Sequence, residues 1–114
     1  METKVKIIGK RGSWFAYAGK EYGDLPCVHK EWFKRGTPHF YYSDKGYKSG
    51  NRQWDELVEG IREKKRVILT KDRWNENKTA FERTGYVAIY DIDNVALTDS
   101  ELRFDFIKRL AEAE

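Results

Sequence analysis

Apolar side chains recur at helical spacing in one segment of the chain, residues 51–65. Trp54, Leu57, Val58 and Ile61 stand at positions i, i+3, i+4 and i+7, so they form one stripe along a helix. Asn51 precedes this stripe and has the side-chain oxygen of a helix N-cap. The pattern predicts an amphipathic helix over residues 51–65 that buries its stripe, Trp54 included, in the core.

Shorter apolar runs, bounded by glycine, proline and aspartate, predict strands on both sides of this helix. Side chains alternate between the two faces of a strand, so in residues 13–18 both faces carry aromatic rings. The predicted strands are residues 4–8, 13–18, 25–33, 40–42, 67–70 and 86–97.

The last segment of the chain has the features of a second helix. Thr98 and Glu101 have the spacing of a capping box, and Leu102, Phe106 and Leu110 recur every four residues. We therefore expect a helix over residues 100–112.

The order of these elements predicts a single α+β domain spanning residues 1–114. A curved mixed or antiparallel sheet, or a small open β-barrel of about five or six strands, would be covered by the two helices. A chain of 114 residues is long enough to build a core without disulfides or metal. In outline this arrangement resembles the PUA-like and EVE-like barrels, and this analogy of architecture implies binding of RNA or modified bases.

Aromatic residues and positive charge are concentrated in the same half of the chain. Residues 1–50 hold ten of the 17 aromatic residues, and ten Lys or Arg against five Asp or Glu. The remaining residues hold 12 Lys or Arg against 14 Asp or Glu. Exposed rings interleaved with basic groups are typical of nucleic-acid-binding surfaces, because rings stack on bases and cations contact phosphates.

We therefore expect DNA or RNA as the partner. Tyr47 has a second interpretation, because its ring could pack against the sheet and anchor the loop of residues 43–50. The same residue types also dominate protein interfaces, so the alternative is a protein-interaction or inhibitor module of a phage or bacterial host-conflict system. The expected nucleic-acid contacts are Trp14, Trp32, Tyr42, Tyr47 and Trp74 among the aromatic residues, and Arg11, Lys30, Lys34, Arg35, Lys45 and Lys48 among the basic ones.

Candidates for catalysis or metal binding are few. Cys27, His29 and His39 are too few for a structural zinc site, although Cys27 and His29 share a strand face and could form a nucleophile and base. The remaining candidates for a metal-dependent nuclease are Asp91 with Asp93, and Glu76 followed by Lys78, but Asp beside Asn is also typical of a turn. The sequence has no glycine-rich phosphate loop. We expect no metal, no cofactor and no enzymatic activity.

The compartment follows from the cysteine content and from hydropathy. A single cysteine excludes an intramolecular disulfide, and no apolar run reaches the roughly 18 residues that span a bilayer. We expect a cytoplasmic protein without a membrane partner.

Overall fold

The structure is a computed structural model that describes residues 3–9, 13–48, 50–74, 76–77 and 81–114. These residues form nine strands, two helices and one 3-10 turn. The strands are β1 (Thr3–Val5), β2 (Ile8–Gly9), β3 (Phe15–Tyr17), β4 (Asp24–His29), β5 (Phe33–Lys34), β6 (Tyr41–Asp44), β7 (Arg66–Trp74), β8 (Phe81–Leu97) and β9 (Leu102–Ala113). The helices are α1 (Gly19–Tyr22) and α2 (Arg52–Lys64), and the 3-10 turn η1 is Lys30–Trp32.

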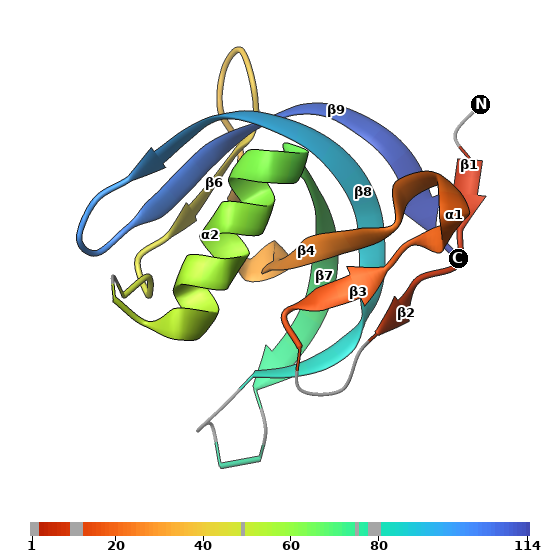
Figure 1. The fold of residues 1–114 in the computed structure, drawn as a ribbon, viewed down its shortest axis with the longest axis horizontal. Helices are drawn as coiled ribbons and strands as arrows, with labels where there is room; N and C mark the ends of the chain where they lie inside the picture. Colours follow the sequence, from red (N-terminus) through yellow and green to blue (C-terminus); the bar gives the residue numbers. More distant parts are fainter. Residues whose placement is uncertain (1–2, 10–12, 49, 75, 78–80) are drawn as a thin grey trace.

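All nine strands belong to one mixed sheet (Figure 1). The strand order is β2-β3-β4-β7-β8-β9-β6-β5, with β1 added beside β9. The β4–β7 and β1–β9 pairs are parallel, and the other pairs are antiparallel. The predicted α+β class with a mixed sheet is confirmed. The predicted barrel of five or six strands is not, because the described residues form nine strands and the outer strands β2 and β5 do not close the sheet.

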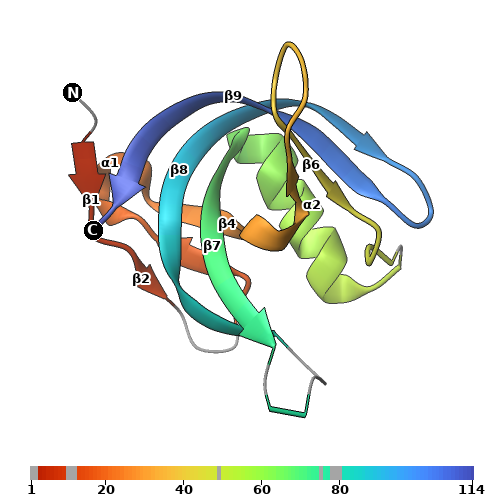
Figure 2. The same cartoon turned by 180° about the vertical axis from the view of Figure 1, so that it is seen from behind.

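The long strands β7, β8 and β9 curve strongly, and α2 lies against their concave side (Figures 1 and 2). Their pairing contains several register shifts, and such bulges bend a strand and increase its twist. Helix α2 buries Leu57, Val58 and Ile61 under this arch. The Asn51 side chain caps the helix by accepting hydrogen bonds from the backbone N–H groups of Gln53 and Trp54. The predicted helix at residues 51–65 is therefore confirmed.

The second predicted helix, residues 100–112, is wrong, because this segment is strand β9. Leu102, Phe104 and Phe106 are buried at every second position, which is the period of a strand. The four-residue spacing of Leu102, Phe106 and Leu110 fits a strand face as well as a helix stripe. Tertiary pairing decides between them, because β9 lies between β8 and β6 and hydrogen-bonds to both.

The buried apolar side chains form two clusters on the sheet. The larger cluster lies under α2 and includes Tyr42 and Phe104, whose rings stack with centroids 4.8 Å apart and an interplanar angle of 12°. The smaller cluster is centred on Leu25, Ile68 and Ile89. No helix in the part of the chain that the structure describes is long and apolar enough to cross a membrane.

Candidate functional site: an aromatic pocket beside α2

A pocket of about 550 Å³ opens between the N-terminal end of α2 and the sheet, and we call it the central pocket. Its walls come from seven parts of the chain: the segment before β3, β4, η1, β6 with its following turn, α2, β7 and β8. A ligand pocket typically combines apolar walls with a few polar groups, and this one does. Its lining residues are Ser13, Trp14, Cys27, His29, Trp32, Tyr42, Asp44, Gly46, Trp54, Leu57, Asp72 and Arg83.

Aromatic rings form much of the wall of the central pocket. Trp14 and Trp54 meet edge to face, with ring centroids 5.0 Å apart and an interplanar angle of 79°. Tyr47 packs against Trp54 from another side in a similar geometry, at 5.4 Å. Trp32 lies on η1, directly after β4. Trp54 therefore contacts two other rings, those of Trp14 and Tyr47, in and behind the pocket wall.

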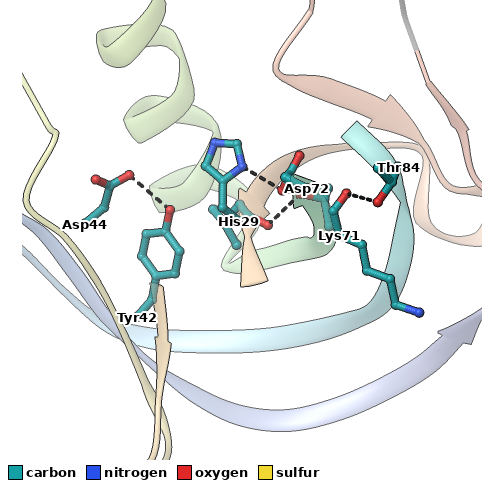
Figure 3. A network of polar contacts seen from close by, with 8 residues as sticks. His29, Tyr42, Asp44, Lys71, Asp72 and Thr84 are labelled. Carbon is teal, nitrogen blue, oxygen red and sulfur yellow. Dashed lines mark hydrogen bonds and ion pairs between the residues drawn. The ribbon is translucent and has the colours of Figure 1, made fainter. Parts of the chain in front are cut away.

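A hydrogen-bonded chain forms one polar side of the pocket (Figure 3). The ring Nδ1 of His29 lies 2.8 Å from Oδ2 of Asp72, and the Thr70 hydroxyl donates to the same oxygen at 2.7 Å. The parallel β4–β7 pairing creates this contact, because it sets His29 opposite Thr70 and Asp72 follows two residues later on the same strand. The carboxylate can only accept, so His29 donates through Nδ1.

The Asp72 carboxyl is held in its charged form by these partners. Burial is the largest single influence and acts to raise its pKa, but the hydrogen bonds from His29 and Thr70 oppose it. The positive charges of His29 and Arg83 act in the same direction, so the pKa of Asp72 lies below its ordinary value.

A second buried carboxyl, that of Asp44, faces the pocket from the end of β6. It accepts hydrogen bonds from the Tyr42 hydroxyl at 3.2 Å and from the Gly46 backbone N–H at 2.8 Å. Burial raises the pKa of Tyr42 well above its ordinary value, and the neighbouring Asp44 carboxylate adds to the rise. Tyr42 therefore remains a hydroxyl donor, and Figure 3 shows it directed at Asp44.

Cys27 lines the pocket as a thiol and not as an activated nucleophile. Burial raises its pKa to about 11, Arg83 opposes this rise, and Asp72 adds to it. Nucleophilic cysteines require a lowered pKa, so this environment disfavours thiolate chemistry at neutral pH. Cys27 and His29 do line the same pocket, as two residues on one strand face can. The raised pKa of Cys27 argues against their acting as a nucleophile and a base.

The other chemistry candidates lie elsewhere. His39 lines a separate hollow together with Phe33 and Phe40. Asp91 accepts a hydrogen bond from Arg66 at 2.8 Å, and Asp93 accepts one from the backbone of Asn94. Glu76 is exposed, and Lys78 lies outside the described residues. Among the residues that the structure describes, no three His, Cys, Asp or Glu side chains gather in a way that could hold a metal ion.

The predicted nucleic-acid contacts divide into three groups. Trp14, Trp32 and Tyr42 come together in the central pocket. Tyr47 is only 7% exposed and belongs to the larger core cluster, whereas Trp74 is 51% exposed at the end of β7. The basic residues Lys30, Lys34, Arg35, Lys45 and Lys48 are exposed, and Arg11 lies outside the described residues.

Sequence reasoning left four important pocket residues out of the predicted contacts: Asp44, Trp54, Asp72 and Arg83. Trp54 was expected in the core because of its helical stripe, and it does pack on the core, but it also lines the pocket. Asp72 and Arg83 carry no local signal, because their role depends on strand pairing with distant residues. Buried and partly buried residues alternate along β6, and Asp44 occupies a buried position. The sequence around Asp44 does not indicate this burial.

A larger and more open hollow, of about 590 Å³, runs along α2. Four of its seven lining residues are charged side chains of α2, and none is a tryptophan. The central pocket is therefore the better candidate for specific binding. Comparison with family models, curated proteins and solved structures found no match to this chain.

Proposed function

We propose that this protein binds nucleic acid by taking one unpaired base into the central pocket. The observation that carries the proposal is the combination of three tryptophans and Tyr42 with polar side chains around a cavity of about 550 Å³. Aromatic rings stack on any base, and proteins that read a single base hold it between such rings and contact its edge with polar groups. The cavity also leaves room for a modified base.

The positions of the exposed basic residues support the same proposal. Lys30 directly follows His29 in the chain, and Lys45 directly follows Asp44, so two cations adjoin residues of the pocket. The ammonium group of Lys34 lies 6.0 Å from the ring centroid of Trp32. A strand whose base enters the pocket would therefore meet positive charge at the rim, where its phosphates lie.

The proposal is tested by measuring the affinity of a labelled single-stranded oligonucleotide by fluorescence anisotropy at low salt. We expect Trp32→Ala to weaken binding by about 1 to 3 kcal/mol, the range for removing one stacking ring. Phe40→Ala is the matched control, because Phe40 is an exposed ring outside the central pocket. Equal affinity of Trp32→Ala and the parent protein would overturn the proposal.

A protein-interaction role is the second candidate, and a different surface supports it. Phe40 and Ile107 are each 42% exposed and line the same hollow of about 400 Å³. Adjacent exposed apolar side chains often mark a protein interface. Salt dependence separates the two roles, because phosphate binding weakens steeply with salt concentration through counterion release, whereas an apolar interface changes little.

A further inference from the structure

Asp44 is a buried acidic residue of the central pocket without an ion-pair partner among the described residues. It is only 4% exposed, and it lines the cavity wall. Its two contacts come from neutral donors, the Tyr42 hydroxyl and the Gly46 N–H. Among the described residues, no Lys, Arg or His forms an ion pair with it. A buried carboxylate is costly unless donors surround it, so a ligand that supplies another donor gains binding energy here.

Both carboxylates of the pocket still have acceptor capacity. The two hydrogen bonds of Asp44 fall on different oxygens, and each carboxylate oxygen has two lone pairs. The two hydrogen bonds of Asp72 both fall on Oδ2, and Oδ1 takes part in neither. An ionised carboxylate has no hydrogen to donate, so Asp44 and Asp72, which line the pocket at different places, each accept from a ligand and repel its carbonyl oxygens.

The natural bases differ in how well they fit these carboxylates. Cytosine, adenine and guanine each carry an exocyclic amino group, which donates hydrogen bonds. Uracil and thymine carry a carbonyl oxygen in place of that group and keep only the ring N3–H as a donor on this edge. Both neighbours of that donor are carbonyl oxygens, which the carboxylates repel. Cytosine and uracil have the same ring size, so they isolate this difference from stacking area.

We infer that the central pocket selects a base with an exocyclic amino group over uracil or thymine, and that Asp44 is the residue that determines this specificity. The inference rests on the proposed base binding and adds the class of base. In a complex, the amino group donates to the Asp44 carboxylate while the ring stacks on tryptophan. Arg83 lines the same pocket and supplies a donor for the carbonyl or ring nitrogen of the bound base.

The test compares single-stranded oligocytidine and oligouridine of equal length, titrated against the parent protein at one fixed salt concentration. We expect oligocytidine to bind about 10-fold more tightly, within the discrimination that a matched polar contact provides. Asp44→Asn replaces one carboxylate oxygen with an amide NH₂ donor of the same shape. This variant should lower the preference for oligocytidine at least severalfold, mainly by improving the binding of oligouridine.

The outcomes separate this inference from the proposal on which it rests. Equal binding of the two oligomers, or tighter binding of oligouridine, overturns base selection while leaving base binding intact if Trp32→Ala still weakens both. Binding of neither oligomer overturns the proposed function and the inference together. An unchanged preference in Asp44→Asn overturns the role of Asp44. Should that variant fail to fold, as judged by circular dichroism, the parent protein still tests base selection, and Asp44→Glu, which keeps the charge but moves the carboxylate, tests Asp44 in its place.

Discussion

At the scale of single residues, Asp72 contributes both to the stability of the fold and to the geometry of the central pocket. Its carboxylate fixes the orientation of the His29 ring and ties β4 to β7 through Thr70. Thr70 itself is fully buried, and its hydroxyl also lies 3.3 Å from the carbonyl oxygen of Val28. The network is therefore anchored in the core on one side and faces the cavity on the other.

The lowered pKa of Asp72 gives a prediction about acid stability. A carboxyl whose pKa is lower in the folded than in the unfolded state stabilises the fold above its unfolded pKa, and this stabilisation is lost as the pH falls through the folded pKa. We expect Asp72→Asn to be less stable than the parent protein at neutral pH. The two stabilities should converge from about pH 5 downward, measured by urea unfolding. Parallel stability curves at all pH values would contradict this account.

Tyr47 gives a second prediction at this scale, because its ring is buried against Trp54 and not presented to solvent. Tyr47→Ala should lower the free energy of unfolding by about 3 kcal/mol, as for truncation of other large buried rings. Tyr47→Phe keeps the ring and should change it little. Urea denaturation measures both variants, and an unchanged midpoint for Tyr47→Ala would show that the ring is not part of the core.

At the scale of elements, β9 joins three other strands, β8, β6 and β1, in the sheet. It pairs with β8 along most of its length, with β6 near its start and with β1 near its end. Its first half supplies Leu102, Phe104 and Phe106 to the larger core cluster. Strand β9 also pairs with β6, which carries Tyr42 and Asp44. The position of these two pocket residues therefore depends on β9.

Phe104 distinguishes the strand from the helix that the sequence alone predicts for residues 100–112. It is fully buried in the strand, although it lies outside the four-residue repeat on which the helix was predicted. Phe104→Ala should cost about 3 to 5 kcal/mol of stability. Ile107→Ala, at a position that is 42% exposed, is the control and should cost far less. Similar losses for the two variants, measured by chemical denaturation, would contradict the observed alternation.

The elements also show what the sequence can predict. Helix α2 was predictable because its cap, its stripe and its basic end all indicate the same structure, and it folds largely through local contacts. Strand β9 was not, since its apolar spacing fits two periods and only pairing with β8 selects one. Among the pocket residues, aromatic content identified Trp14, Trp32 and Tyr42, whereas Asp72 acquires its role from His29, which lies 43 positions away in the sequence.

At the scale of the whole molecule, the curved sheet gathers distant residues around one cavity, and Lys34 lies beside the Trp32 ring that lines it. Residues 1–50 carry a net charge of 10 − 5 = +5, and the rest carry 12 − 14 = −2. Lys34 and Arg35 belong to the basic half and are exposed directly after Trp32 and Phe33. If phosphates bind beside the pocket, the position of these charges matters more than the total charge of the protein.

Charge reversal at these two positions tests that statement. Lys34→Glu combined with Arg35→Glu should weaken binding of single-stranded nucleic acid at low salt without unfolding the protein. Loss of two phosphate contacts should also reduce the slope of log affinity against log salt concentration by about 1.4.

Arg62→Glu combined with Lys64→Glu changes the total charge equally on the exposed side of α2 and is the matched control. A local phosphate site requires the first pair to lose far more affinity than the second. Equal losses would mean that only the net charge of the molecule attracts nucleic acid, and unchanged binding by the first pair would remove Lys34 and Arg35 from the interface.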